Sequence, residues 1–249
     1  MTDPADWFKN MPIFTKYWLT LTVVISVLAR FGILPGYLLY LAPELIFQKF
    51  QLWRLLTCVF FYPMGYQFLL NCYFLYSYSL RLENEQFKST PGDYFYLLFI
   101  NWACCVIVGL LFKLPLLMDP LILAVVYVWC QFNKDVIVRF WFGTQFKAMY
   151  FPWVLLALNV VLSSGIDSLV GIFVGHLYYF LKIKYPQELG GMSYLDTPSF
   201  IKSYFPDVRG GVHGFGFAPQ NQRRDQPAAG QQNRFFSDSW GRGRPLGRD

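Results

Sequence analysis

The chain has 249 residues, of which 55% are hydrophobic, 20% aromatic and only 14% charged. Soluble domains carry about a quarter of charged residues, so this composition excludes an ordinary soluble globular protein. Apolar runs of about 18 or more residues recur and predict an integral membrane protein with several spans. The cysteines lie in apolar segments without a CxxC spacing, which favours small buried hydrophobes over a disulfide set. They are Cys58, Cys72, Cys104, Cys105 and Cys130.

The chain begins MTDPADWFKN, which carries two aspartates and no basic cluster at its start. A cleaved secretory signal begins with such a cluster, so we expect the first span to remain in the protein. Residues 1–16 are then a short aqueous lead. The first span is expected at residues 17–34, and Pro35 and Gly36 end it.

The stretch that follows, Glu44–Thr57, is apolar enough to seek lipid and too polar to cross it. At helical spacing it has two faces, and we therefore expect an amphipathic helix lying along one membrane surface. The polar face consists of Glu44, Gln48, Gln51 and Arg54. The apolar face consists of Phe47, Phe50, Trp53 and Leu56.

Five further spans are predicted, which makes the fold class an all-α protein with six transmembrane helices. Their ranges are 56–80, 94–112, 114–132, 150–164 and 166–183. A charged loop at 81–93 and a polar loop at 133–149 separate them, and the short connection at Lys113 predicts a tight hairpin. The fifth span covers about 22 Å of a hydrocarbon core near 30 Å thick, so it either thins the bilayer or has inexact boundaries.

The basic residues predict which way the spans run. Six spans place both termini on one side, and that side holds 17 of the 21 Lys and Arg residues. The other four are Arg30, Lys49, Arg54 and Lys113. By the positive-inside rule both termini are cytosolic, and the amphipathic helix lies on the lumenal side.

Beyond Tyr185 the chain is dominated by Gly, Pro, Gln, Asn and Arg, which predicts disorder from about residue 207. The expected organisation is a membrane domain at 1–190 and a cytosolic, largely disordered tail at 191–249.

Three features inside the spans carry candidate functions. Gly171 and Gly175 form a GxxxG that lets a neighbouring helix backbone come close. His176 follows at once, without an obvious carboxylate partner, and is expected to have a packing role. Asp119 and Asp167 lie near span ends, so a small-molecule transporter using these acids and His176 stays open as an alternative.

A family resemblance rests on further residues. In FLLNCYFLYSYSLRLE, Asn71 precedes Glu83 by twelve residues, and this stretch resembles the second span of the rhomboid superfamily. The WR pair at Trp53 and Arg54 and the GxxxG are two further rhomboid marks. The chain as a whole is similar to the derlins, rhomboid-derived pseudoproteases of the endoplasmic reticulum, and among them to the long-tailed ones. The stretches that resemble derlins are NMPIFTKYW, FQLWRLLT, YVWCQFNKD, FWFGTQFKA, GHLYYFLKIKYP and GGVHGFG.

A rhomboid protease needs a serine in a GxSG on span 4 and a histidine three residues before the GxxxG. Span 4 here contains no serine, and the histidine position is Ser168. The resemblance therefore implies no catalytic residue, cofactor or metal, and a structural role for Asn71 and Glu83. The alternative is an active intramembrane serine protease, in which one of Ser26, Ser77 and Ser79 would have to find a base.

The resemblance implies a function in moving misfolded proteins out of the endoplasmic reticulum for ubiquitin-dependent degradation, within the unfolded protein response. Trp53 and Arg54 would distort the membrane.

The tail segment 240–247 resembles the SHP box that docks on the valosin-containing AAA ATPase, with Trp240, Gly241, Gly243 and Leu246 as contacts. RNA binding by its arginines is the alternative. Other expected partners are a membrane ubiquitin ligase complex with adaptors, misfolded substrates, the lipid bilayer and further copies in homo- or hetero-oligomers, but no nucleic acid.

Overall fold

The structure is a computed structural model, and it describes residues 4–139, 144–163, 167–188, 190 and 195–207. The chain divides into two compact units, Met1–Gly214 and Phe215–Asp249. The second unit lies outside the described residues, and every helix and strand named below belongs to the first unit.

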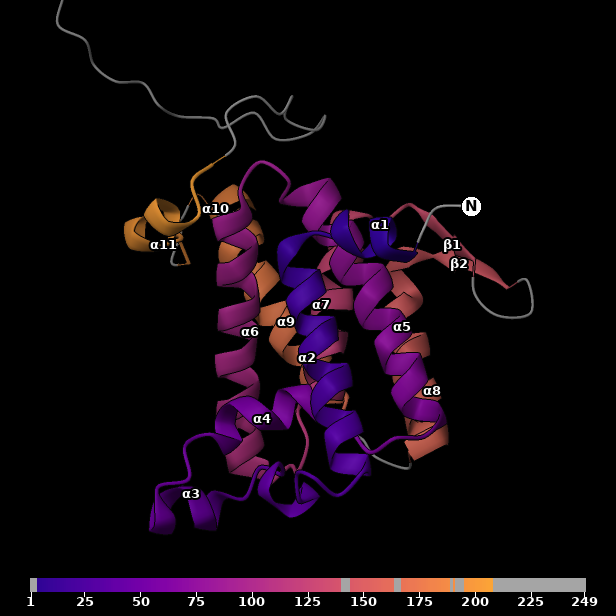
Figure 1. Ribbon diagram of the computed structural model, residues 1–249. Coiled ribbons are helices and arrows are strands. Elements are labelled where there is room, and N and C mark those ends of the chain that lie inside the picture. Colours follow the sequence, from indigo (N-terminus) through magenta and orange to yellow (C-terminus); the bar gives the residue numbers. More distant parts are fainter. Residues whose placement is uncertain (1–3, 140–143, 164–166, 189, 191–194, 208–249) are drawn as a thin grey trace, which may run out of the picture. The chain divides into compact units, whose positions relative to one another are not determined.

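The described part is mostly helical (Figure 1). Its α-helices are α1 (Pro4–Lys9), α2 (Ile13–Arg30), α3 (Pro43–Lys49), α4 (Arg54–Phe60), α5 (Tyr66–Arg81), α6 (Pro91–Phe112), α7 (Met118–Phe132), α8 (Phe151–Ser163), α9 (Leu169–Tyr179), α10 (Tyr185–Glu188) and α11 (Ser199–Tyr204). Short 3-10 turns are η1 (Gly36–Leu38) and η4 (Ala148–Tyr150), and π-helical turns are η2 (Leu82–Gln86) and η5 (Phe180–Lys184).

Helix α7 is the centre of the bundle, and nearly all of its side chains are buried. It packs against α9, α5, α6 and α8, while α2 packs on α5 and α4. This central place explains why α7 is apolar on every side, as a helix enclosed by other helices must be.

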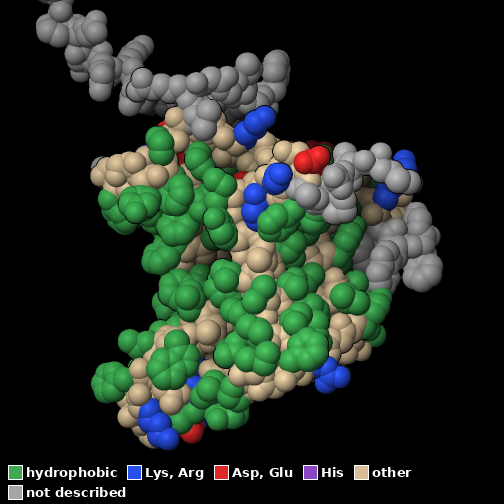
Figure 2. Space-filling view, in the orientation of Figure 1, with side chains coloured by type: hydrophobic (Ala, Val, Ile, Leu, Met, Phe, Trp, Pro, Cys, Tyr) green, Lys and Arg blue, Asp and Glu red, His purple; other side chains and the backbone are tan. Residues whose placement is uncertain are grey.

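Two of the described helices, α2 and α6, are long and apolar enough to cross a bilayer. The residues 118–132 and 148–162 form shorter apolar helices. Figure 2 shows hydrophobic side chains over the middle of the molecule, whereas Lys, Arg, Asp and Glu gather at its two ends. This distribution suits a protein held in a membrane, while the number of six spans stays a prediction.

The two ends of the bundle carry different segments. Figure 1 shows α1, the strand pair and α11 at one end and α3 at the opposite end. We call these the α1 end and the α3 end. The strands β1 (Ile137–Arg139) and β2 (Gln145–Lys147) pair antiparallel, with Val138 opposite Phe146, inside the segment for which only a polar loop was predicted.

The prediction of one amphipathic helix over Glu44–Thr57 is wrong. Helix α3 ends at Lys49 because Phe50 adopts a left-handed backbone conformation, with φ of 50°. Helix α4 begins at Arg54, so residues 50–53 form a break between two short helices.

The second predicted span also begins too early. Residues 61–65 separate α4 from α5, and the Pro63 ring is incompatible with the interior of a continuous helix. The helix that corresponds to most of the 56–80 prediction is therefore α5, which begins at Tyr66.

A further difference concerns the segment that was assigned to the tail. Residues 199–204 form α11, which packs against α6, and the side chain of Ile201 is buried. The packed domain therefore extends beyond the predicted boundary at residue 190.

Candidate functional site

A row of hydrogen-bonded polar side chains lies inside the bundle toward the α3 end. The Gln67 amide donates to Asn159 Oδ1 over 2.7 Å, and the Asn159 amide donates to Ser168 Oγ over 3.0 Å. Beside them, Asn71 Nδ2 donates to the Asp119 carboxylate. These five residues come from α5, α7, α8 and the start of α9, and we call them the polar row.

The polar row has hydrogen-bonding capacity that its members do not use among themselves. Within the described residues, Gln67 Oε1 is buried and has no hydrogen-bond partner. A buried acceptor without a partner costs about 1–3 kcal/mol, so it favours any donor that can reach it. A peptide N–H is such a donor.

The polar row has no group that could act as an activated nucleophile. Ser168 accepts a hydrogen bond from an amide, and no histidine of the described residues is hydrogen-bonded to it. His176 instead lies against Tyr127, with 2.7 Å between the Tyr127 hydroxyl and His176 Nδ1. Tyr127 follows Asp119 by eight residues, which separates them by about 12 Å along α7.

Two of the three serines considered for protease activity are hydrogen-bonded to groups that are not histidines. Ser79 Oγ lies 2.7 Å from Thr15 Oγ1 and 2.6 Å from the Tyr94 hydroxyl. Ser26 Oγ accepts from the Tyr62 backbone N–H over 3.2 Å. Ser77 is half-buried on α5. Within the part of the chain that the structure describes, neither hydrogen-bonded serine has the histidine contact that activation requires.

The transporter alternative needs Asp119, Asp167 and His176 to act together. Asp119 is hydrogen-bonded to Asn71, Asp167 is exposed, and His176 pairs with Tyr127. The structure thus places the histidine in a separate contact from the two acids.

Arg54 is buried and forms hydrogen bonds with the segment of chain that precedes α4. Its Nη1 donates to the carbonyl oxygens of Tyr37 and Tyr40 over 2.7 and 2.9 Å, and its Nε donates to Gln51 Oε1 over 2.7 Å. Only 1% of its surface is exposed. Arg54 therefore fixes the fold of residues 37–51 from inside and does not lie on an exposed polar stripe.

Its neighbour Trp53 points the other way, with 52% of its surface exposed. Other large apolar side chains of this segment are exposed as well, and they are Phe47, Phe50, Leu52 and Leu56. So many exposed aromatic and aliphatic groups are stable in a membrane interface and costly in water. The WR pair thus combines a buried arginine that binds the preceding chain with an exposed apolar ring.

The GxxxG glycines face α7. A Cβ atom on Gly171 would lie 2.2 Å from the Pro120 carbonyl oxygen, and one on Gly175 would lie 2.7 Å from the Ala124 carbonyl oxygen. Both distances are too short for a real contact, so these positions need glycine for the close approach of two backbones. The glycines therefore hold α9 against α7 within one chain.

Glu83 caps a helix that lies far away in the sequence. Its carboxylate accepts from the backbone N–H groups of Phe14 and Thr15 over 3.2 and 3.0 Å, and from Thr15 Oγ1 over 2.8 Å. The first N–H groups of α2 would otherwise lack partners, and a negative charge suits that end of a helix. Burial raises the pKa of the Glu83 carboxyl, while these hydrogen bonds oppose the rise.

The predicted tail contacts Trp240, Gly241, Gly243 and Leu246 lie outside the described residues. Of the other predicted site residues, Trp53 and Arg54 lie in the chain that leads to α4, Asn71 lies in the polar row, and Glu83 lies at the α1 end. They are therefore separate places in the fold and do not form one site.

Comparison with known proteins identifies the family. The model of the Der1-like family matches residues 11–199. The chain belongs to the derlin family. It is 47% identical to Derlin-1 of Drosophila melanogaster over 251 residues, which cover 99% of this chain and all of the fly protein. It is 46% identical to Derlin-1 of Homo sapiens over 252 residues, which cover 99% of both chains. It is 42% identical to Derlin-1 of Caenorhabditis elegans over 217 residues, which cover 85% of this chain and 88% of the worm protein.

For this derlin, sequence reasoning missed Gln67 and Asn159 as functional candidates. A signal was present, because Asn159 is the one amide in the apolar helix FPWVLLALNVVLS. Polar residues inside a span are costly in lipid and mark functional positions. Their pairing across 92 residues of sequence needed the structure.

Proposed function

We propose that this derlin is a non-catalytic factor, or a channel component, for retrotranslocation of misfolded proteins from the endoplasmic reticulum to the cytosol. Its substrates would then be degraded by the ubiquitin-proteasome system. The observation that carries the proposal is the polar row, which provides hydrogen-bonding groups among membrane helices and lacks a nucleophile with a base.

A polypeptide crossing a membrane in an unfolded state exposes backbone N–H and C=O groups. Each unsatisfied group costs several kcal/mol in lipid. The side-chain amides of Gln67, Asn71 and Asn159 can both donate and accept, and Gln67 Oε1 is an acceptor still without a partner in the described chain. Exchange of these bonds with a passing backbone would lower the cost of its passage.

The short length of α8 supports the same function. Helix α8 has 13 residues and is about 20 Å long, against a hydrocarbon core of about 30 Å. Short apolar helices thin the surrounding bilayer. The exposed apolar groups around Trp53 would add to this distortion at the α3 end, and an undistorted bilayer around the purified protein would contradict this part.

The proposed location is the endoplasmic reticulum membrane, with the α1 end in the cytosol and the α3 end in the lumen. The excess of Lys and Arg in the segments of the α1 end supports this orientation. The tail would dock on the valosin-containing AAA ATPase, which supplies the energy. Other proposed partners are a membrane ubiquitin ligase complex with its adaptors and further derlin copies.

A degradation chase tests the proposal. Cells lacking this protein receive the wild type, Trp53→Ala, Trp153→Ala, or a chain that ends before Trp240, and the decay of a misfolded lumenal reporter is followed. Trp153 is a matched control, because it lies on α8 and is 54% exposed, compared with 52% for Trp53.

We expect wild type and Trp153→Ala to restore decay, and Trp53→Ala and the shortened chain to fail. Equal decay in all backgrounds, including cells without the protein, would contradict the proposal. A fluorophosphonate probe that labels the protein would favour a protease, and substrate-dependent flux in proteoliposomes would favour a transporter. Recovery of the ATPase that is unchanged by Gly241→Ala and Gly243→Ala would remove the tail contact.

A further inference from the structure

An apolar groove runs between α2 and α6, away from the polar row. It has a volume of about 430 Å³. Helices α4 and α7 contribute its remaining walls, and all of its lining side chains are hydrophobic or aromatic. On α2 and α6, the lining residues include Phe14, Trp18, Leu98 and Trp102. The groove lies on the part of the molecule that Figure 2 shows between the charged ends.

The groove exists because its two long helices pack on different neighbours. Helix α2 packs on α5 and α4, whereas α6 packs on α9 and α7. At the α1 end the two helices come together through aromatic rings. The rings of Phe14 and Phe95 lie 5.8 Å apart, and the Phe205 ring lies 5.2 and 5.5 Å from them. These three rings mark the end of the groove.

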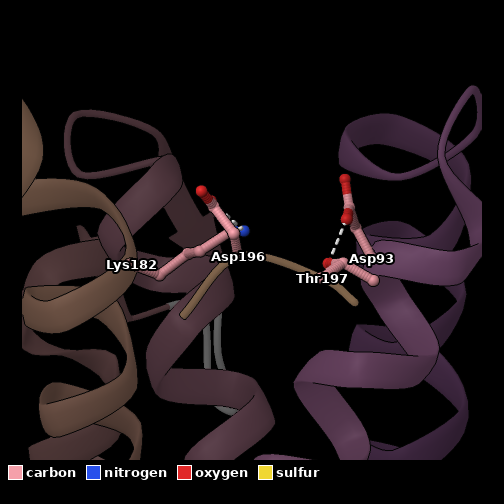
Figure 3. A network of polar contacts seen from close by, with 4 residues as sticks. All are labelled: Asp93, Lys182, Asp196 and Thr197. Carbon is pink, nitrogen blue, oxygen red and sulfur yellow. Dashed lines mark hydrogen bonds and ion pairs between the residues drawn. The ribbon is translucent and has the colours of Figure 1, made fainter. Parts of the chain in front are cut away.

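The segment that brings Phe205 there is fastened to the bundle on both sides. Figure 3 shows Thr197, whose hydroxyl donates to the Asp93 carboxylate at the start of α6, and Lys182, which pairs with Asp196 over 3.4 Å. A Cβ atom on Gly92 would lie 3.4 Å from the Phe205 carbonyl oxygen, which shows how closely this segment approaches α6. These contacts hold the segment that carries Phe205 against α6, and so they fix the aromatic end of the groove.

Within the membrane, a groove of this kind can be occupied by a lipid chain or by another transmembrane helix. The absence of charge from its lining matches a hydrocarbon chain. The α1 end carries Lys9, Lys16 and Lys202, which are positive groups at the level expected for a lipid phosphate.

We propose that this groove binds one acyl chain of a phospholipid, with the headgroup at the α1 end. Trp18 lies about 8 Å along α2 from its first residue, which is the depth at which headgroups give way to hydrocarbon. Its ring lines the groove, and its indole N–H has no partner among the described residues. The indole nitrogen itself is buried, so the Trp18 ring offers an apolar surface to a lipid chain in the groove. The indole N–H of Trp102, by contrast, already donates to the Leu55 carbonyl over 3.0 Å.

Photolabelling tests this proposal without reference to retrotranslocation. The full-length protein is reconstituted with phosphatidylcholine that carries a diazirine in one acyl chain, and labelled residues are identified by mass spectrometry. Leu69 and Tyr73 on α5 provide an exposed control surface, with 65% and 60% of their areas accessible. We expect labelling of Trp18 and Trp102 to exceed that control about tenfold, which corresponds to a preference of about 1.4 kcal/mol.

Variants in the groove make the test specific. Leu98→Phe fills part of the groove and is expected to remove the excess labelling. Leu111→Phe on the same helix is its control, because Leu111 is 73% exposed and does not line the groove. If Leu98→Phe does not fold, Leu56→Phe replaces it, since Leu56 also lines the groove and is 54% exposed.

Even labelling of the groove and the α5 surface would overturn the proposal, as would full labelling of the filled variant. A photoreactive transmembrane peptide is tested in parallel. If that peptide labels the groove and the lipid does not, the occupant is a helix and the proposal is wrong.

Discussion

Gly171 provides a test of the helix contact at the centre of the molecule. In Gly171→Ala, the new Cβ would lie 2.2 Å from the Pro120 carbonyl oxygen and 2.9 Å from its carbonyl carbon. Both atoms belong to the backbone, so no side-chain rotation relieves the clash, and α9 must move away from α7 by about 1 Å. Overpacking of this kind costs about 3 kcal/mol, at the upper end of its usual range. The better helix propensity of alanine offsets about 1 kcal/mol.

The expected net loss is therefore about 2 kcal/mol, which lowers the unfolding temperature of a chain of this size by about 4–8 °C. Thermal unfolding of the purified protein in detergent, followed by tryptophan fluorescence, measures it. Gly175→Ala should lose less, because its Cβ would lie 2.7 Å from the nearest atom. Gly65→Ala should lose only about 0.5–1 kcal/mol, because no atom lies within 4 Å and only the preference of the α5 N-cap for glycine over alanine is affected. If Gly171→Ala unfolds at the temperature of Gly65→Ala, the assigned contact is wrong.

Four other substitutions test the remaining contacts. Arg54→Lys loses the guanidinium group, whose Nη1 binds two carbonyl groups while its Nε binds Gln51, and should cost about 2–4 kcal/mol, seen as faster proteolysis of residues 37–51. Asn71→Leu leaves the buried Asp119 without its amide partner and should lower stability by about 3 kcal/mol in denaturant unfolding. Glu83→Gln keeps the shape of the cap but removes its charge. It should lower the free energy of unfolding by about 1 kcal/mol, which corresponds to about 2–4 °C in the unfolding temperature. Thr197→Val removes the bond to α6 and should speed chymotrypsin cleavage after Tyr204, which is exposed, with little change in global stability.

Controls on the protein surface make these four results interpretable. Lys113→Arg alters only an exposed ion pair with Glu44 and should leave stability within about 0.5 kcal/mol of the wild type. A stable Arg54→Lys or Asn71→Leu variant would show that the buried contacts do not contribute the stability assigned to them. Unchanged cleavage in Thr197→Val would mean that aromatic packing alone holds the segment.

The helices of the bundle could be predicted from the sequence because apolar runs of sufficient length have few other stable environments. The runs around residues 17–34 and 94–112 correspond to α2 and α6, with ends that differ by up to four residues. Such differences arise because helix ends depend on caps. Helix α2 starts at Ile13 since Glu83, which is 70 residues away in sequence, satisfies its first N–H groups.

The segment before α4 could not be predicted in the same way. Helical spacing places Arg54 on a polar stripe, and periodicity alone favours its exposure. The structure buries it because two backbone carbonyls, those of Tyr37 and Tyr40, converge on its guanidinium group. Carbonyl groups of a turn leave no mark in a sequence pattern, so this clamp is visible only in three dimensions.

The polar row was equally inaccessible to spacing arguments. Asn71 could be found through its resemblance to rhomboids, but its contact with Asp119 joins α5 to α7, and Gln67 reaches Asn159 on α8. These contacts depend on how the helices pack around α7. The two glycines of the GxxxG share a helix face by spacing alone, whereas the helix they approach came from the structure.

The central claim is that unfolded substrate passes along the polar row, and site-specific crosslinking tests it most directly. A photoreactive amino acid is placed at Gln67, or at the exposed control position Tyr73 on the same helix, and cells are illuminated while a misfolded reporter is being degraded. We predict a crosslink to the reporter from position 67 and none from position 73. Derlin-dependent decay without a crosslink at position 67, or with equal crosslinks at both positions, would contradict the claim.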